Sequence, residues 1–478
     1  MTQNQRWTGM IFNGRWIPAE GGATTKIVSP LDGEVVAEVG EASVGDVARA
    51  AESAAAAGRA WNALGIDERV AVFNRAAAII ERDADEIREW IQKEVGSVSG
   101  MTAVEIQYGT ELVRQGAALC AAPRGEILPS MKPGQKNYAR RVPRGVVGVI
   151  GPWNAPFMLS LRNVAPALAL GNAVVLKPAP QTPVSGGVLI ARIFEEAGLP
   201  AGVLQVVPGD GPTGAALTTD PNINSIAFTG STAIGRAVGR AAGENLKPVQ
   251  LELGGNNAYI VLEDANLETA VDIGLACSVF ANGQGCLVIG RHLVHESIAE
   301  EYAATIAAAA ADVKAVDPRT NSEAMQGPLV NQKQLDHAVD LTRRAEDAGA
   351  RKLVGDPPEG LYFSAHVYDN VAADNPLFLE ETFAPVVGIT SFKTDEEAIA
   401  LANASEYGLT CSIMTSDAGR AMAIADNIRS GNIHINDVTS LAVAWAPLGG
   451  VGHSGNGTAF GGSADLDAYT SWQWVTQS

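Results

Sequence analysis

Short apolar runs alternate with segments of helical length from Arg144 onward, and this alternation restricts the fold more than any other feature. The runs cover residues 146–150, 173–176, 203–207 and 225–228, with helical patterns such as 183–196 between them. Strands spaced by helix-length segments predict a parallel sheet with helices on both faces. We therefore expect an α/β protein whose doubly wound sheet binds a nucleotide beyond the carboxyl ends of its strands.

A second series of the same kind follows Gly255. Residues 290–295 and 385–392 predict strands, and 297–313, 332–348 and 395–403 predict helices. The chain has 478 residues, which is too long for one ordinary core. The sequence predicts two α/β domains that meet near residues 252–255, with an interdomain cleft as the natural place for a site.

The other segments predict strands over 10–40, helices over 43–64 and 67–95, and an extended arm over 121–144. Ser43 is a typical N-cap for the first helix. One face of the second helix carries Val70, Phe73, Ala77 and Ile80. The aromatic tail 468–475 is expected to pair with the arm, either within a subunit or across two.

Charge and cysteine usage exclude several classes of protein. The net charge of −19 disfavours nucleic acid or an anionic membrane as a partner. No uncharged apolar run approaches the ~18 residues of a membrane span, and the first residues lack the apolar core of a signal peptide. The four cysteines have no metal-ligand spacing, so we expect free thiols, no metal and a cytoplasmic protein.

Cys286 and Glu252 combine two groups that covalent catalysis on a carbonyl needs. Glu252 ends the apolar run 249–252, and Cys286 closes the glycine-rich turn 283–286. A thiol there could attack the carbonyl, and a carboxylate could later activate water. A lone cysteine is otherwise a small buried apolar residue. None of the six histidines lies in a motif, which disfavours a Cys-His protease pairing.

Turns at predicted strand ends suggest a nucleotide site. Residues 228–235 end a strand and open a helix whose first amides could receive a phosphate. This GSTxxG pattern departs from the dinucleotide fingerprint GxGxxG, and the alternative is an ordinary turn. Trp153 and Asn154 follow another strand and Lys177 a third, although an isolated lysine is usually a solvated charge.

Five motifs occur in the order seen in the aldehyde dehydrogenase superfamily, which the chain resembles from residues 12–14 to 447–450. They are 152–154, 228–231, 252–255, 283–286 and 381–385. The resemblance implies a Rossmann-like cofactor domain (1–120 and 144–253), an α/β catalytic domain (254–452) and a small β oligomerisation arm (121–143 and 462–478). It also implies an aldehyde substrate, NAD or NADP, and a homodimer or homotetramer.

The resemblance assigns roles to individual residues. Cys286 resembles the nucleophile and Glu252 the base that activates water, while Asn154 and the Cys286 N–H resemble the oxyanion hole, in which one donor can be worth ~3 kcal/mol. The residues similar to the cofactor contacts are Trp153, Lys177, Gly230, Ser231, Glu381 and Phe383. Pro180 stands where many NAD-preferring members have an acidic residue, so NADP use stays open.

Segments 161–172, 177–183, 452–457 and 472–474 resemble the benzaldehyde and vanillin branch, which implies aromatic aldehydes as substrates. On a helix starting near Ala155, one face beside Asn154 would line the aldehyde tunnel. The predicted lining residues are Ala155, Met158, Leu159 and Arg162, with Trp445 opposite. The alternatives are core packing for this face and a structural ion pair for Arg162.

Other functions stay open beside this interpretation. An aliphatic or semialdehyde dehydrogenase would share the chemistry and differ in the tunnel. A coenzyme A-acylating relative is disfavoured because Glu252 would direct water to the same intermediate. The remaining alternatives are a hydrolase that uses Cys286 without a nicotinamide and a non-catalytic binding protein with this fold.

Overall fold

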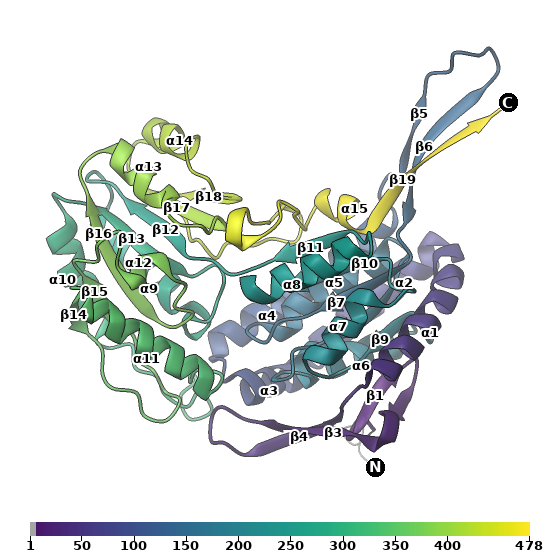
Figure 1. Cartoon of the computed structure of the whole chain (residues 1–478), viewed down its shortest axis with the longest axis horizontal. Helices are drawn as coiled ribbons and strands as arrows, with labels where there is room; N and C mark the ends of the chain where they lie inside the picture. The colour runs from purple at the N-terminus through teal and green to yellow at the C-terminus, as the bar shows by residue number, and fades with distance from the viewer. Residues whose placement is uncertain (1–5) are drawn as a thin grey trace.

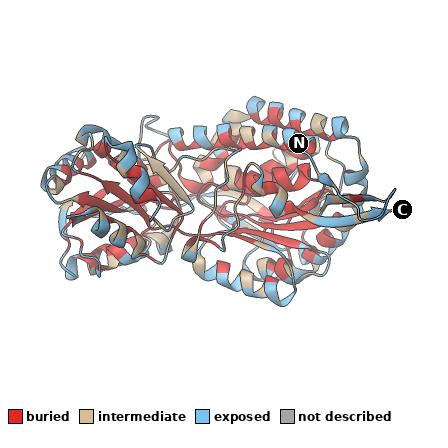
Figure 2. Cartoon of the chain, turned by 90° about the horizontal axis from the view of Figure 1, so that it is seen from above, coloured by how far each residue is buried: buried red, intermediate tan, exposed pale blue. Residues whose placement is uncertain are grey.

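The computed structural model describes residues 6–478 and divides them between two lobes (Figure 1). Each lobe is built on a seven-stranded sheet, and a three-stranded sheet projects from the first lobe. Figure 2 shows the strands of both large sheets buried among helices that expose their outer faces. The prediction of an α/β protein with two parallel-sheet units and a small β element is confirmed.

The first sheet has the order β11-β10-β7-β8-β9-β1-β2. Its parallel strands are β7 (Val146–Ile150), β8 (Ala173–Lys177), β9 (Leu204–Val206), β10 (Ser225–Thr229) and β11 (Val249–Glu252). The hairpin β1 (Met10–Asn13) and β2 (Trp16–Pro18) adds antiparallel strands to β9. The chain runs from β7 outward to β9 and returns to β10 on the other side. The strand order therefore reverses between β7 and β10, the place where such sheets bind ligands.

A helix follows each parallel strand of this sheet except β11, after which the chain continues directly to β12. These helices are α5 (Pro156–Ala169) after β7, α6 (Leu189–Glu196) after β8, α7 (Gly211–Thr219) after β9 and α8 (Thr232–Glu244) after β10. The helix predicted over 183–196 begins with a π-helical turn, η3 (Val184–Val188). Four further helices precede β7 in the chain, namely α1 (Val44–Ala63), which packs on the sheet, α2 (Ile66–Arg82), α3 (Ala84–Val95) and α4 (Ser99–Cys120).

The N-cap at Ser43 is confirmed, whereas the single helix over 67–95 is wrong. Ser43 Oγ accepts the Asp46 N–H at 3.0 Å, and the Asp46 carboxylate accepts the Ser43 N–H at 2.9 Å. The long helix breaks at Asp83, which leaves the helical region with φ −98° and ψ 17°. Its carboxylate pairs with Arg82 at 2.7 Å and Arg192 at 3.3 Å. The contact with α6 is tertiary, and the sequence period does not reveal it.

The second sheet has the order β14-β15-β16-β13-β12-β17-β18. Its strands are β12 (Asn257–Val261), β13 (Ile289–His295), β14 (Arg351–Val354), β15 (His366–Asp369), β16 (Val386–Phe392), β17 (Thr410–Met414) and β18 (Asn432–Ile435). All neighbours are parallel except β14 and β15. The helices include α9 (Leu267–Val279), α10 (Ala299–Ala310), α11 (Gln332–Asp347), α13 (Asp395–Asn403) and α14 (Ala418–Ala425). The chain crosses from one sheet to the other between β11 and β12.

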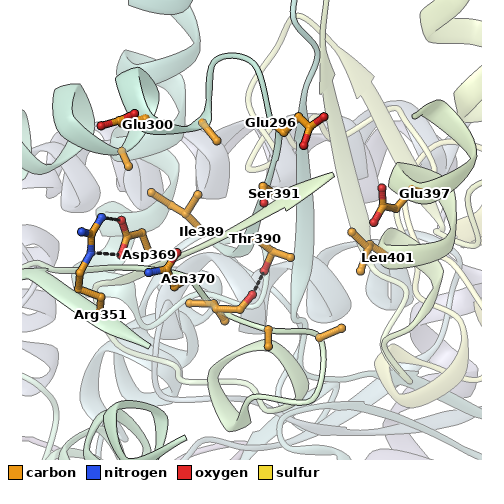
Figure 3. Close-up of a pocket in the computed structure, with 15 residues that line it drawn as sticks. Glu296, Glu300, Arg351, Asp369, Asn370, Ile389, Thr390, Ser391, Glu397 and Leu401 are labelled. Carbon is orange, nitrogen blue, oxygen red and sulfur yellow. Dashed lines mark hydrogen bonds and ion pairs between the residues drawn. The ribbon is translucent and has the colours of Figure 1, made fainter. Parts of the chain in front are cut away.

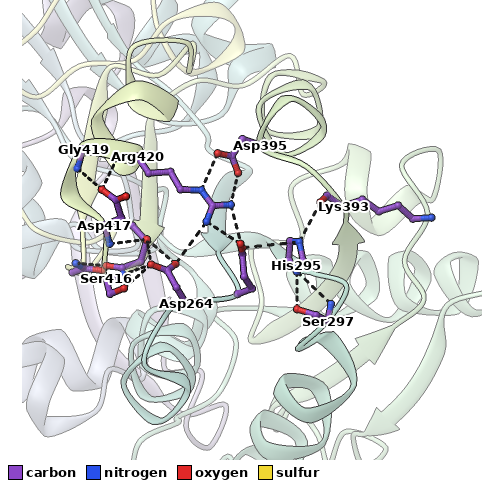
Figure 4. Close-up of polar contacts among 12 residues, drawn as sticks. Asp264, His295, Ser297, Lys393, Asp395, Ser416, Asp417, Gly419 and Arg420 are labelled. Atoms are coloured by element: carbon purple, nitrogen blue, oxygen red, sulfur yellow. Dashed lines mark hydrogen bonds and ion pairs between the residues drawn. The ribbon is translucent and has the colours of Figure 1, made fainter.

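Arg420 ties together three elements at the outer edge of the second lobe (Figure 4). Its guanidinium donates to Asp395 at the start of α13, at 2.6 and 2.8 Å, and to Glu263 after β12, at 3.0 and 3.1 Å. Asp264 accepts the hydroxyls of Thr415 and Ser416 beside it. These groups are partly exposed, so each pair contributes modestly while the network holds the edge in register.

The arm pairs with the C-terminal tail within one chain. Strand β19 (Thr470–Gln477) runs antiparallel to β6 (Lys136–Pro143), which pairs with β5 (Gly125–Leu128). Trp472 and Trp474 are largely exposed on this sheet, and the Arg141 guanidinium lies 4.3 Å from the Trp472 ring. Among residues 6–478, no helix is both long and apolar enough to cross a bilayer.

Candidate functional site

A cavity between the lobes brings together residues from both sheets. Asn154 and Glu252 reach it from the first lobe, and Cys286 reaches it from the second. The predicted tunnel residues Ala155, Met158, Leu159 and Arg162 also line it. Trp445 does not line the cavity, and its side chain is 63% exposed. The tunnel assignment of Trp445 is therefore wrong, because the loop that carries it turns the indole outward.

The turn before Cys286 is held in a strained backbone conformation. Ala281 and Asn282, in η4 (Phe280–Gly283), have φ values of +52° and +57°. The Asn282 amide donates to carbonyls of Gly96 and Pro328 at 3.2 Å, and its oxygen accepts the Gly327 N–H at 2.8 Å. Left-handed non-glycine residues cost free energy and persist where surrounding contacts impose them. Here the contacts aim the thiol into the cavity.

The Asn154 side chain lies next to this turn. Asn154 follows β7 at the reversal of strand order, and its Nδ2 donates to the Gln284 carbonyl at 2.9 Å. Gln284 stands two residues before Cys286, so an amide donor lies beside the thiol. That arrangement suits stabilisation of negative charge on an oxygen attached to a carbon that the thiol has attacked.

Glu252 is a buried carboxylate with an oxygen to spare. It ends β11, is 5% exposed, and its Oε1 has no hydrogen-bond partner among the residues that the structure describes. Burial raises the pKa of Glu252 well above its ordinary value, and the positive charge of Arg162 opposes the rise. A carboxyl group with a raised pKa is a stronger base once ionised, which suits removal of a proton from water.

The surroundings of Cys286 favour the protonated form of its thiol. Burial, the Glu381 carboxylate and the Glu252 carboxylate together raise the pKa of the thiol to about 12. All three effects disfavour the thiolate, which is the reactive form. Attack by this sulfur therefore requires transfer of its proton or a nearby positive charge.

A second group of predicted residues lies where the strand order reverses. Ser231 precedes α8 without a side-chain cap, so the first amides of this 13-residue helix are free for an anion. Lys177 ends β8, and its Nζ donates to the Pro178 carbonyl at 3.1 Å. Burial lowers the pKa of Lys177 to about 8, with Asp210 opposing the shift. The free amides of α8 could bind a phosphate of a dinucleotide, and Lys177 could bind one of its ribose hydroxyls.

Glu381 and Phe383 connect this group to the cavity. Glu381 Oε1 accepts the Gly255 N–H at 2.7 Å, and burial raises the pKa of this carboxyl to about 7. Phe383 has a φ of +52°, and its ring meets the Trp153 ring edge-on at 5.4 Å. A Cβ on Gly283 would lie 2.1 Å from the Pro385 nitrogen, so only glycine allows this segment to approach the cysteine turn. These side chains therefore fit the reactive end of a dinucleotide cofactor.

Several further residues line the cavity that the sequence analysis did not predict as lining residues, although four of them lie within its motifs. They are Met101, Tyr108, Thr229, Leu253, Phe280, Ala281, Gly285, Leu287, Leu409, Ala442, Leu448 and Phe460. Tyr108 and Met101 come from α4, where helical periodicity only marks a buried face. Phe460 follows the glycine turn 447–450, and no local pattern indicates that it returns to the cavity.

Arg162 packs between two of these aromatic rings. Its guanidinium lies 3.9 Å from the Phe460 ring and 5.6 Å from the Tyr108 ring, and its Nη2 donates to the Phe460 carbonyl at 3.1 Å. Arg162 forms no ion pair with any described residue, and its Nε and Nη1 have no partner. This argues against the structural ion pair and leaves two buried N–H donors beside the cavity.

A larger hollow on the second lobe carries no comparable chemistry (Figure 3). It has a volume of about 650 Å³ and is lined by Glu296, Glu300 and the paired Arg351 and Asp369, among others. No cysteine and no serine–histidine pair is found among the described residues that line this space. The Cys286 cavity is therefore the candidate site.

Known proteins share this arrangement along almost the whole chain. A vanillin dehydrogenase from Amycolatopsis sp. is 46% identical over 99% of this chain and 97% of its own length. A benzaldehyde dehydrogenase [NAD(+)] from Pseudomonas putida is 42% identical over 98% of this chain and 96% of its own. The crystal structure of an NADP-dependent enzyme from E. coli matches with a TM-score of 0.96 and 29% identity, covering 100% of this chain and 99% of that one.

The family assignment agrees with the order of the motifs and with the two-lobed fold. The match to the family covers the first lobe, the cysteine turn and nearly all of the arm. Residues 16–475 match the aldehyde dehydrogenase family, and the chain belongs to that family.

Proposed function

We propose that this protein oxidises aromatic aldehydes of the benzaldehyde or vanillin kind to carboxylic acids, with NAD as the hydride acceptor. The observation that supports it most is the cavity at Cys286, in which mainly apolar and aromatic side chains surround a few polar groups. The relatives named for vanillin and benzaldehyde support the same substrate class.

The proposed mechanism assigns each catalytic side chain one task. The Cys286 thiol releases its proton to water, the sulfur attacks the aldehyde carbon, and the Asn154 amide with the Cys286 N–H stabilises the resulting oxyanion. When bound, the nicotinamide accepts the hydride that leaves this carbon. The carbon is thereby oxidised to a thioester on Cys286. Glu252 then takes a proton from the water that attacks the thioester, which releases the acid and restores the thiol.

The proposed cofactor contacts are those at the strand-order reversal. Lys177 would hold a ribose hydroxyl, and Gly230 and Ser231 would place the pyrophosphate at the start of α8. Trp153, Glu381 and Phe383 would orient the nicotinamide end. The similarity to the benzaldehyde dehydrogenase [NAD(+)] of Pseudomonas putida favours NAD, whereas Pro180 removes the repulsion that an acidic side chain would exert on the 2′-phosphate of NADP.

An aliphatic or semialdehyde substrate is the second candidate. Arg162 gives the cavity a positive charge with unpartnered N–H groups, and a negatively charged tail on the aldehyde would pair with it. An aldehyde with a carboxylate at the far end tests this alternative directly.

A homodimer or homotetramer and a cytoplasmic location complete the proposal. The exposed Trp472 and Trp474 on the arm support assembly through that sheet, and the four free cysteines agree with a reducing compartment. Sedimentation should give the mass of a dimer or tetramer for the wild-type chain and a lower mass for a variant truncated after Asp467, which lacks β19.

The test is the rate of reduced nicotinamide formation on benzaldehyde, vanillin, hexanal and succinic semialdehyde, with NAD and NADP measured separately. We expect the highest kcat/KM with an aromatic aldehyde and NAD, and none in Cys286→Ala. A preference for hexanal or succinic semialdehyde would contradict the aromatic assignment. If the folded protein turned over none of these aldehydes, the proposal that it is an aldehyde-oxidising enzyme would be contradicted.

A further inference from the structure

The helix that follows Asn154 has no N-cap of its own. Its N-cap residue is Ala155, which has no side-chain oxygen, and its first residue is Pro156, which has no N–H. The side chain of Asn154 points elsewhere and donates to Gln284. The N–H groups of Phe157 and Met158 therefore need an acceptor from another part of the chain.

Glu105 supplies that acceptor from α4. Its Oε2 accepts the Phe157 N–H at 3.1 Å and lies 3.5 Å from the Met158 nitrogen. Glu105 is fully buried, and its Oε1 has no partner among the described residues. Burial raises the pKa of Glu105 to about 8, while the two backbone N–H groups oppose the rise. Burying a carboxyl group costs free energy, and here the hydrogen bonds to the first amides of α5 offset part of that cost.

Glu94 makes the equivalent contact with the helical segment that follows the next strand, β8. Its carboxylate oxygens accept the N–H groups of Val184 and Ser185 at 2.8 and 2.7 Å, as well as the Ser185 hydroxyl. These residues begin η3, which follows β8 and Lys177 just as α5 follows β7 and Asn154. Glu94 is also fully buried and comes from the neighbouring helix α3. The chain thus offers a matched pair of buried caps at two different strand ends.

We propose that Glu105 is a positioning residue for Asn154: by binding the free amides of α5, it fixes the start of that helix and the direction of the Asn154 side chain. Asparagine is itself among the best N-capping residues. With Glu105 absent, the free amides of α5 would attract the Asn154 oxygen and draw the side chain away from Cys286. This inference rests on the proposed role of Asn154 as the oxyanion donor.

A double-mutant cycle between Glu105→Leu and Asn154→Ala tests the proposal. The measurement is the rate constant of the first turnover at saturating cofactor, followed by reduced nicotinamide absorbance on benzaldehyde. We expect Glu105→Leu to lower this rate constant by about 10- to 100-fold, since small misplacements of catalytic groups cost that much. In the Asn154→Ala background, Glu105→Leu should lower it by less than about threefold, because the two residues act as one unit. Glu105→Gln retains an acceptor oxygen and should stay within about fivefold of the wild type.

Glu94→Leu serves as the matched control for loss of a buried cap. It should raise the KM of the nicotinamide cofactor and leave the first-turnover rate constant within about threefold. Equal losses in both Asn154 backgrounds, or the same kinetic pattern in Glu94→Leu and Glu105→Leu, would overturn the proposal. If Glu105→Leu does not fold, Glu105→Asp withdraws the carboxylate from the amides and enters the same cycle. Inactive wild-type protein would instead refute the proposed function itself.

Discussion

The side-chain amide of Asn154 donates to the backbone carbonyl of Gln284 across the two lobes, at 2.9 Å. Asn154 belongs to the turn after β7, and Gln284 belongs to the turn that carries Cys286. One hydrogen bond therefore holds the proposed oxyanion donor beside the turn that carries the proposed nucleophile, although the two residues come from different lobes. The lobes cannot shift relative to one another without separating these two groups.

Loss of the Asn154 amide should slow the chemistry without unfolding the protein. We expect Asn154→Ala to lower kcat by about 10²- to 10³-fold, because one oxyanion-hole donor is worth that much. The aldehyde panel measures kcat, and thermal melting with circular dichroism serves as the control for folding. A kcat within threefold of the wild type would contradict the assigned role.

Replacement of Glu252 should separate the two halves of the reaction. In Glu252→Gln the Cys286 sulfur can still attack, but no carboxylate takes the proton from water. We expect a burst of reduced nicotinamide equal to the enzyme concentration, followed by turnover slowed by about 10²-fold or more. Mass spectrometry should then find the acyl group on Cys286. A full loss of the burst would show that Glu252 acts before the thioester forms.

The reactivity of Cys286 should depend on pH through the Glu381 carboxylate. Burial and the negative charges of Glu381 and Glu252 raise the pKa of the thiol to about 12, so alkylation by iodoacetamide should accelerate as pH rises above neutrality. Glu381→Gln removes one negative charge and lowers that pKa, which increases the thiolate fraction at a given pH. We expect alkylation to be faster by up to about tenfold, or one pKa unit.

The sign of this effect follows from the pKa of Glu381, which is about 7 because the carboxyl is buried. Above pH 7 the wild-type Glu381 carboxylate is charged, so the variant should be alkylated faster than the wild type by the largest factor. Below pH 7 the wild-type carboxyl is already neutral, and the two alkylation rates should become equal. Glu380→Gln is the matched control, because its exposed side chain pairs with Arg344. The other three cysteines are buried, so the labelling reports Cys286. An equal gain in both variants would contradict the assignment.

The width of the cavity should control the choice of aldehyde. Leu159 lines the cavity and is partly buried, so Leu159→Trp would fill space that an aromatic ring needs. We expect kcat/KM for benzaldehyde and vanillin to fall about tenfold or more relative to hexanal, a loss typical of a changed apolar pocket. Trp445→Leu is the control, since Trp445 lies outside the cavity and should leave this ratio unchanged. An unchanged ratio in Leu159→Trp would refute the tunnel assignment.

Most of the residues that sequence reasoning identified share one property. Asn154, Lys177, Ser231 and Glu252 each stand at or shortly after the end of a parallel strand, whereas Cys286 stands in a glycine-rich turn between elements. Chemistry-bearing side chains concentrate at such ends because the carboxyl edges of parallel strands converge on one crevice. Their order along the chain resembles that of the aldehyde dehydrogenase family, and this resemblance predicted that they meet in one site.

The features that the sequence analysis did not predict, or predicted wrongly, depend on contacts between distant segments. Phe460 contacts Arg162 across 298 residues, and Tyr108 reaches the same guanidinium from a helix with no special pattern. The helix break at Asp83 coincides with an ion pair between Asp83 and Arg192 on α6. Trp445 lies outside the cavity, although Ala442, three residues earlier, lines it. Each depends on a partner or a loop path that local period does not record.

The sequence by itself determined the two mainly parallel sheets and predicted the candidate reacting groups. These depend on alternation of apolar runs and on turns that need particular residues, both of which are local. Only the tertiary structure decided how the groups are held: the Asn154–Gln284 bond, the burial that shifts the pKa of Cys286 and Glu381, and the Glu105 cap on α5. Distances and desolvation arise when distant segments pack, and a linear pattern carries neither.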